Sequence, residues 1–185
     1  DAFRYFFSRH IPTQDDGDFT WERFEIAYNT ELANDLGNLV SRVENMVNKY
    51  EAGVVGDGDY GEHDIQQYIE AMEEYKFNVA MDEIWASVRD LNRYIEMVKP
   101  WEVAKRRDTD TDAADHLTDI LGHCTATLLQ IADQLEPLLP DTAKKIHDTF
   151  ATGVTVNQGG VLFPRVELTP AVAPEAPAAA PSIEQ

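Results

Sequence analysis

The sequence predicts an all-α fold, an antiparallel helix bundle with an extended C-terminal segment and a disordered tail. Apolar residues recur at spacings of three and four along most of the chain, which is the period of helices that pack one face on a core. Proline, glycine and acidic residues interrupt this pattern, and the connections are short enough to join antiparallel neighbours. With 185 residues, 43% of them hydrophobic, the chain can form one folded domain.

The N-terminal third predicts two helices. Residues 1–10 form a short aromatic helix, which ends before Pro12 because a residue that precedes proline avoids helical geometry. After a polar turn, Thr20 can cap a long helix that ends near Tyr50. The apolar stripe of this long helix consists of Trp21, Phe24, Ala27, Tyr28, Leu32, Leu36, Leu39, Val40, Val43, Met46, Val47 and Tyr50.

Further helices follow a glycine- and acid-rich loop at residues 53–64. Their expected positions are about 65–75, 77–98, 112–135 and 140–150, with a short helical piece that starts at Pro100. After these, residues 154–168 are expected to lie as an extended segment over the bundle. Residues 169–185 are rich in proline and alanine, which is typical of a flexible tail.

The composition limits the possible functions. Acidic residues outnumber Lys and Arg by 34 to 15, which gives a formal charge of −19 and opposes non-specific binding to DNA or anionic membranes. No apolar run approaches the ~18 residues of a membrane span, and the N-terminus does not read as a signal peptide. The single cysteine, Cys124, suits a reducing cytoplasm. The first residue is not Met, as in a fragment or a processed chain.

The acidic clusters do not predict a metal site. Asp108, Asp110 and Asp112 alternate as in a calcium loop, but the sixth position is Ala113 and the twelfth is Asp119, where that loop needs Gly and Glu. We interpret this stretch as the acidic start of a helix. The histidines and the cysteine have neither zinc nor di-iron spacing, and no catalytic constellation is evident. We therefore expect no metal and no cofactor in this chain.

A polar stripe lies opposite the apolar stripe of the long helix. Asn38 and Arg42 stand one turn apart in it, so both side chains project the same way, and both can read base edges. Gly37 beside them is unfavourable in a helix by ~1 kcal/mol relative to Ala. Close packing or an approaching ligand would each explain this glycine. The stripe consists of Glu31, Asn34, Asp35, Asn38, Arg42, Asn45 and Lys49, and a solvated helix face is the alternative interpretation.

Trp101 follows a proline in the most basic stretch of the chain, "KPWEVAKRR". A tryptophan is usually a core residue, but here it could also be a stacking platform for RNA bases beside basic side chains. The candidate phosphate contacts around it are Lys49, Lys99, Lys105 and Arg106.

Four stretches together resemble methionyl-tRNA synthetases, at the passage from the catalytic into the anticodon-binding domain. They are "FRYFFSRHIPTQDDGDFTWERFEIAYNTELANDLGNLVSR", "AMDEIWASVRDLNRYIEMVKPWEVAK", "LLPDTAKKI" and "GVLFPRVE". The resemblance covers about residues 1–168. It implies an anticodon-binding helix bundle in which Asn38, Arg42 and Trp101 contact the bases of a CAU anticodon. The implied partners are methionine tRNA and the catalytic domain of the same enzyme.

The resemblance also implies a division of the chain. Residues 1–19 would be the remnant of the linker from the catalytic domain, and residues 20–153 the anticodon-binding domain. The nucleotide-binding motifs of the catalytic half do not occur here, so ATP and Mg²⁺ would belong to the parent enzyme, and this chain alone should be inactive. We expect a cytoplasmic monomer that binds neither DNA nor a membrane.

Two other functions fit the same residues. A helical protein-interaction module that has lost RNA binding would suit the acidic surface. The anticodon domain of a sister synthetase, for valine, leucine, isoleucine or cysteine, is a third possibility, which the combination of Asn38, Arg42 and the Pro100-Trp101 pair disfavours.

Overall fold

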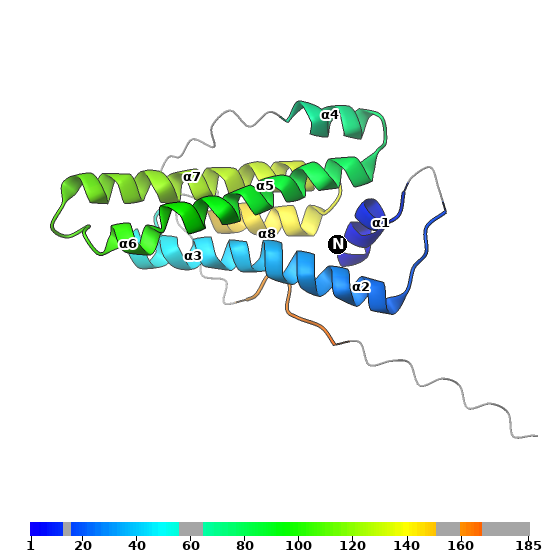
Figure 1. Cartoon of the computed structure of the whole chain (residues 1–185), viewed down its shortest axis with the longest axis horizontal. Coiled ribbons are helices and arrows are strands. Elements are labelled where there is room, and N and C mark those ends of the chain that lie inside the picture. The colour runs from blue at the N-terminus through cyan, green and yellow to red at the C-terminus, as the bar shows by residue number, and fades with distance from the viewer. Residues whose placement is uncertain (13–15, 56–64, 151–159, 168–185) are drawn as a thin grey trace, which may run out of the picture.

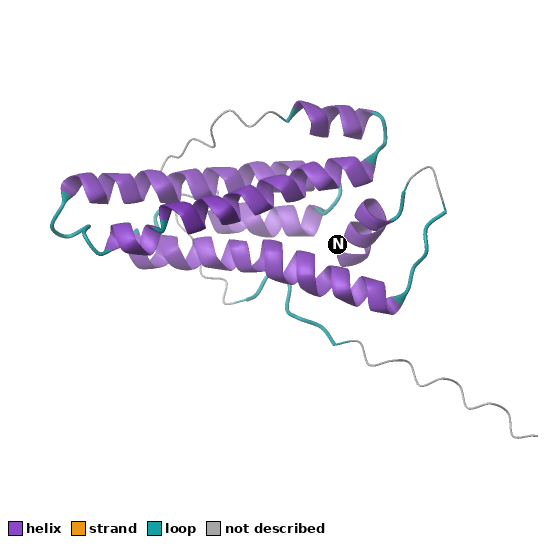
Figure 2. Ribbon diagram, viewed as in Figure 1, coloured by secondary structure: helices purple, strands orange, loops and turns teal. Residues whose placement is uncertain are grey.

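The structure is a computed structural model that describes residues 1–12, 16–55, 65–150 and 160–167. In these residues every regular element is a helix (Figure 2), as the sequence predicts. The elements are α1 (Ala2–His10), α2 (Trp21–Ala27), η1 (Tyr28–Gly37), α3 (Asn38–Tyr50), α4 (Gln66–Glu73), α5 (Phe77–Val98), α6 (Pro100–Ala104), α7 (Thr111–Leu135) and α8 (Pro140–Phe150). The tail, residues 151–159 and most of the predicted loop lie outside the described residues.

The predicted long helix consists of α2, η1 and α3 joined end to end. Thr20 caps it, because its Oγ1 accepts a hydrogen bond from the Arg23 backbone N–H at 3.2 Å. Tyr28 and Asn38, at the two junctions, keep right-handed helical backbone angles, so the chain does not bend away. The middle part, η1, is a π-helix, a winding rare enough in proteins that the sequence pattern does not predict it.

The bundle combines antiparallel and parallel neighbours. Figure 1 shows α7 running opposite to α5, and α8 opposite to α7. By contrast, α3 and α5 run in the same direction, because the connection that contains α4 returns to the far end before α5 begins. Helices joined by a short connection are therefore antiparallel, as predicted, whereas α3 and α5, which a long connection joins, are parallel. The parallel pair puts the C-terminal ends of α3 and α5 together at the end that carries α6.

Each of the main helices contributes buried apolar side chains to one core. Trp85 of α5 is the largest fully buried residue, and Leu36, Leu39 and Val43 of the long helix face the same interior. Most of the apolar stripe of this helix is buried as predicted, with Tyr28 and Tyr50 partly buried and Trp21 at its start exposed. Trp21 remains 56% exposed, with its ring against those of Phe3, Phe19 and Phe24.

Helix α1 is packed into the same core as the rest of the bundle. Tyr5 and Phe6 are each 1% exposed, whereas Phe3 and Phe7 are about half exposed. Asp1 Oδ2 accepts hydrogen bonds from the backbone N–H and the hydroxyl of Thr142 at the start of α8. Arg4 donates to the carbonyl oxygens of residues 137 and 138. Helix α1 is thus a structural part of the bundle, and the interpretation of residues 1–19 as a linker remnant stays a prediction.

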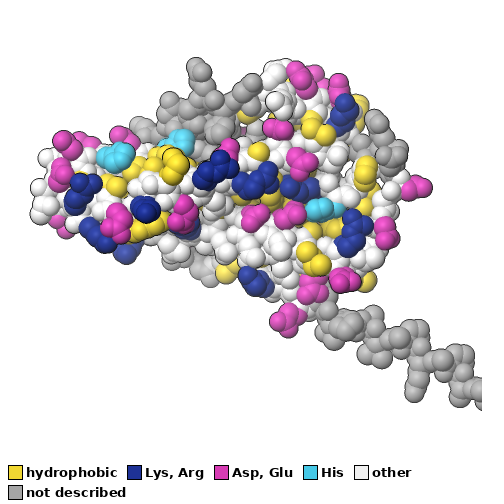
Figure 3. Space-filling model, in the orientation of Figure 1, with side chains coloured by type: hydrophobic (Ala, Val, Ile, Leu, Met, Phe, Trp, Pro, Cys, Tyr) yellow, Lys and Arg dark blue, Asp and Glu magenta, His cyan; other side chains and the backbone are white. Residues whose placement is uncertain are grey.

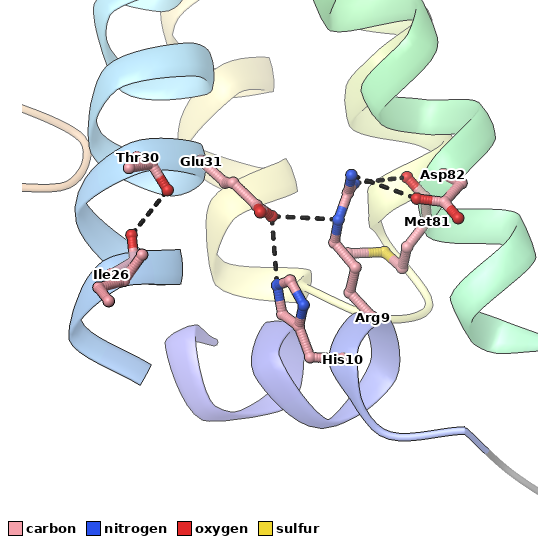
Figure 4. A network of polar contacts seen from close by, with 7 residues as sticks. All are labelled: Arg9, His10, Ile26, Thr30, Glu31, Met81 and Asp82. Atoms are coloured by element: carbon pink, nitrogen blue, oxygen red, sulfur yellow. Dashed lines mark hydrogen bonds and ion pairs between the residues drawn. The ribbon is translucent and has the colours of Figure 1, made fainter. Parts of the chain in front are cut away.

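A polar network fixes the other end of α1 (Figure 4). Arg9 lies 3.1 Å from Glu31 of η1 and 3.2 Å from Asp82 of α5, and it donates to the carbonyl of Met81. His10 Nε2 lies 3.3 Å from the same Glu31 oxygen. Glu31 was assigned to the polar stripe of the long helix, but here it faces α1 because α1 covers that side.

The protonation of this network follows from its burial. Burial, together with the neighbouring Asp35 and Asp82 carboxylates, raises the pKa of Glu31 to about 7. Burial and the adjacent Arg9 guanidinium lower the pKa of His10. At neutral pH, His10 is therefore neutral and Glu31 is partly protonated, so few net charges are buried under α1.

Replacing Glu31 with Gln should change how stability depends on pH. The folded pKa of about 7 lies above the ordinary value of 4.5, so the protonated carboxyl contributes stability that is complete below pH 4.5 and is lost as the pH rises through 7. The free energy of unfolding of the wild type minus that of Glu31→Gln should therefore fall between about pH 4.5 and 8 and then level off. Urea titrations across this range measure the difference, and a difference independent of pH would contradict the assignment.

Candidate functional site

An open groove lies between α3 and the short helix α6. Its volume is about 480 Å³, and it is lined by Asn38, Ser41, Arg42, Asn45, Met46, Lys49, Tyr50 and Trp101. All three residues predicted to form the base-reading site are among these, although Trp101 lies 59 positions after Arg42 and 63 after Asn38. The structure thus places the predicted residues together. Their role in binding stays a prediction.

The polar wall of the groove comes from one face of α3. Asn38, Arg42, Asn45 and Lys49 recur at helical spacing, so their side chains project in one direction. The side chain of Asn38 is exposed and makes no hydrogen bond within the described part of the chain. Its donor and acceptor groups are therefore available to a ligand in the groove.

Arg42 is held by two neighbours. Its guanidinium carbon lies 5.2 Å from the centre of the Trp101 ring, within the range of a cation–π contact. Its Nη2 donates to Glu96 Oε1 of α5 at 2.6 Å. Because both side chains of this ion pair are partly exposed, the pair stabilises the fold by only about 0–1 kcal/mol. A ligand can therefore replace Glu96 at little cost.

The backbone turn between α5 and α6 puts Trp101 at the groove. Lys99 ends α5 in the left-handed region at φ 48°, which is unusual for a residue with a side chain. Pro100 then starts α6 in the first helical position, where its missing N–H leaves no hydrogen bond unmade. Pro100 and Val103 are buried, and Trp101 is half-buried against the core. Trp101 thus packs on the core and also lines the groove, and its role as a stacking platform stays a prediction.

The candidate phosphate contacts are distributed unevenly. Lys49 lines the groove, with its Nζ 5.2 Å from the centre of the Tyr50 ring. Lys105 is paired with Glu102 at 2.8 Å, while Lys99 and Arg106 are exposed outside the residues that line the groove. On the face seen in Figure 3, acidic and basic side chains are interspersed. Of the four candidate phosphate contacts, Lys49 is therefore the one that lines the groove.

Gly37 is explained by packing. It is buried, and a Cβ atom there would lie 3.0 Å from the Leu32 carbonyl oxygen and 3.7 Å from the backbone nitrogen of Phe163. Phe163 belongs to residues 160–167, which run beside η1. Asn29 exchanges two hydrogen bonds with the backbone of Val166, and Asn34 accepts one from Arg165. The tight contact therefore comes from the Leu32 carbonyl of η1 itself, while Phe163 of this segment packs on Gly37 at ordinary van der Waals distance.

The sequence pattern missed part of the groove. Ser41, Met46 and Tyr50 line it, and Glu96 pairs with Arg42, but the predicted site residues include none of them. The sequence does not distinguish them as site residues, because Met46 and Tyr50 belong to the apolar stripe and Glu96 is one of many acidic residues. The acidic stretch after α6 has the role predicted for it, since Asp110 Oδ1 caps α7 by accepting from the N–H groups of Asp112 and Ala113.

Comparison with known proteins identifies the family of the chain. A sequence model described as the anticodon-binding domain of tRNA ligase matches residues 62–163, which is more than half of the chain. The chain belongs to this family of anticodon-binding domains. A second model, described as class I tRNA synthetases (M), matches residues 1–44.

The curated relatives narrow the family to methionyl-tRNA synthetases. A methionine–tRNA ligase of Streptomyces coelicolor is 35% identical over 206 aligned positions, which cover 92% of this chain and 38% of the relative. One of Enterococcus faecalis is also 35% identical, over 91% of this chain and 29% of the relative. The chain thus corresponds to an anticodon-binding part of a methionyl-tRNA synthetase, and it spans well under half the length of these relatives.

Solved structures show the same fold. The free form of Mycobacterium tuberculosis methionyl-tRNA synthetase superposes with a TM-score of 0.79 over 91% of this chain and 39% of that chain, at 24% identity. The complex of that enzyme with methionyl-adenylate gives a TM-score of 0.73 at 26% identity, over 89% and 37%. The all-α prediction is therefore confirmed. Within the described residues, no helix is long and apolar enough to cross a membrane.

Proposed function

We propose that this chain reads the CAU anticodon of methionine tRNA and positions the tRNA for aminoacylation by a separate nucleotide-binding half. The observation that carries the proposal is the contact between Arg42 and Trp101 in a groove that also contains Asn38. RNA-binding proteins recognise single-stranded loops by stacking splayed bases on aromatic rings and by hydrogen bonds to base edges. Trp101 supplies the ring, and Asn38 and Arg42 supply the hydrogen-bonding groups.

The order of events follows from the pairing of Arg42. In the free protein, Glu96 and the Trp101 ring hold the guanidinium in the groove. An incoming base stacks on Trp101, and Arg42 exchanges its bond to the carboxylate for bonds to the base. The bound state keeps the charge of Arg42 compensated, because base acceptors or the RNA phosphates take the place of Glu96.

Affinity in this proposal depends on the groove more than on the overall charge. A chain of formal charge −19 repels the RNA backbone at long range, and this repulsion is reduced by salt. Stacking on an aromatic ring contributes about 1–3 kcal/mol per base and is insensitive to that field. We propose that the domain acts as a monomer in the cytoplasm, where Lys49 in the groove and Lys99, Lys105 and Arg106 around it contact phosphates.

Replacing Trp101 with Ala should weaken binding of an RNA hairpin that carries the CAU loop by about 1–3 kcal/mol, because one stacking surface is lost. Trp101→Phe should keep most of the affinity. Fluorescence anisotropy with a labelled hairpin measures both. Trp21→Ala is the matched control, since Trp21 is an exposed tryptophan outside the groove. Equal losses in the Trp101→Ala and Trp21→Ala variants would contradict a specific role of Trp101, and wild-type binding that is indifferent to the anticodon would favour a protein-interaction module without RNA function.

A second surface fits the implied protein partner. Phe3, Phe7, Trp21 and Ile26 are each about half exposed and lie at the α1–α2 end of the bundle, opposite the end that carries α6 (Figure 1). Phe19 joins the aromatic rings into one cluster. Exposed apolar patches of this kind mark interaction sites. All these residues fall within the part that matches class I synthetases, so we propose that the nucleotide-binding half docks here.

The docking surface can be tested with the nucleotide-binding half of the S. coelicolor methionine–tRNA ligase, expressed separately. Calorimetry should detect binding to the wild-type chain, and Phe3→Ser combined with Trp21→Ser should abolish it, because the apolar contact area is lost. Tyr75→Ser is the control, since Tyr75 is 71% exposed and takes no part in this cluster. Binding that survives the double substitution, or that Tyr75→Ser weakens as much, would contradict the docking surface.

A further inference from the structure

A second cleft lies beside the candidate base-reading groove. Its volume is about 180 Å³, and its walls come from α3, from α8 and from residues 160–162. Val40, Ser41 and Glu44 form the α3 wall. Ser41 also lines the base-reading groove, so the two cavities share one residue and lie on neighbouring faces of the same helix.

The charges in this cleft are only partly compensated. Asp148 is paired with the neighbouring Lys144, at 2.5 Å between Nζ and Oδ2. Lys145, which lines the cleft, has no ion-pair partner within the described parts of the chain. Glu44 is half-buried, and its carboxylate makes no hydrogen bond to another described residue. The cleft therefore offers one cation and one hydrogen-bond acceptor that the fold itself does not use.

Size and lining limit what can enter. The cleft is smaller than the ~300 Å³ at which pockets for drug-sized ligands begin, so a single ring system fits, whereas a nucleotide cofactor does not. Val40, Val161 and Leu162 provide an apolar wall for such a ring. A carboxylate accepts hydrogen bonds from an exocyclic amino group of a base, as Glu does for cytosine. A lysine beside it suits the phosphate of the same nucleotide.

We propose that this cleft binds a second base of the same RNA, an amino-bearing base of the anticodon loop that lies outside the CAU triplet. The inference rests on the proposed function, because the shared Ser41 places the cleft directly next to the groove that would hold the triplet. The ridge of Asn38, Ser41 and Asn45, of which Ser41 is partly buried, then divides the loop. Triplet bases turn toward Trp101, and a flanking base turns toward Glu44, while Lys145 meets its phosphate.

The test uses hairpins with an intact CAU triplet in which one flanking loop nucleotide at a time lacks its base. Fluorescence anisotropy should find one position at which loss of the base weakens binding to the wild-type chain roughly tenfold, the effect of one lost hydrogen bond to a charged group. In the Glu44→Gln variant, removal of the same base should change the affinity less than in the wild type, because the contact is already impaired.

Lys145→Gln should weaken binding of every hairpin, including those with a changed triplet, whereas Lys144→Gln should not. Lys144 is the matched control, because it neighbours Lys145 on α8 and its removal changes the net charge equally, but it pairs with Asp148 and does not line the cleft. The inference is overturned if no flanking base affects binding, or if the two lysine variants behave alike.

The test of the second cleft can fail independently of the test of the proposed function. If Trp101→Ala weakens binding while the abasic hairpins, Glu44→Gln and Lys145→Gln change nothing, the base-reading groove stands and the second cleft is wrong. If Trp101→Ala has no effect and the triplet does not influence binding, the proposed function fails, and this inference fails with it.

Discussion

The position of the Arg42 guanidinium, between the Trp101 ring and the Glu96 carboxylate, is the contact on which the proposed site depends. It joins α3, α5 and α6, three elements that the sequence separates widely. Two features of the backbone make it possible. The parallel course of α3 and α5 allows Arg42 to pair with Glu96, and the left-handed turn at Lys99 leads into α6, where Trp101 lines the groove. The strain of that turn is small enough, about 1–3 kcal/mol, for the surrounding packing to maintain it.

The opposite end of the bundle is organised around α1. Its buried rings fill the core beside Trp85, and its polar side chains hold α8, η1 and α5. Because Glu31 and Asn38 lie on one continuous helix, the α1 network and the groove share a rigid element. The exposed aromatic rings of Phe3, Phe7 and Trp21 lie at this end of the bundle, opposite the end that carries α6. The fold thus separates a polar groove suited to RNA from an apolar surface suited to protein.

Much of this arrangement could be predicted from the sequence, because local rules decide it. Periodicity sets the helices, Thr20 and Asp110 cap them, and the spacing of Asn38 and Arg42 puts both side chains on one face. Other features depend on contacts between distant residues and could not be predicted. The pattern assigned Trp21 to the core and Glu31 to the surface, but α1 reverses both expectations by covering one side of η1 and leaving the edge of α2 open. Gly37 is explained by the winding of η1, which brings the Leu32 carbonyl oxygen to 3.0 Å from the position of a Cβ atom, and by the packing of Phe163 beside it.

The central claim is that the groove distinguishes bases. The most direct measurement is a titration of the wild-type chain with four hairpins of one stem, one carrying the CAU loop and three in which a single base of the triplet is exchanged. The account predicts that at least one exchange weakens binding by about 1–3 kcal/mol, because a hydrogen-bonded base edge is lost. Equal affinity for all four hairpins, at the same salt concentration, would contradict it.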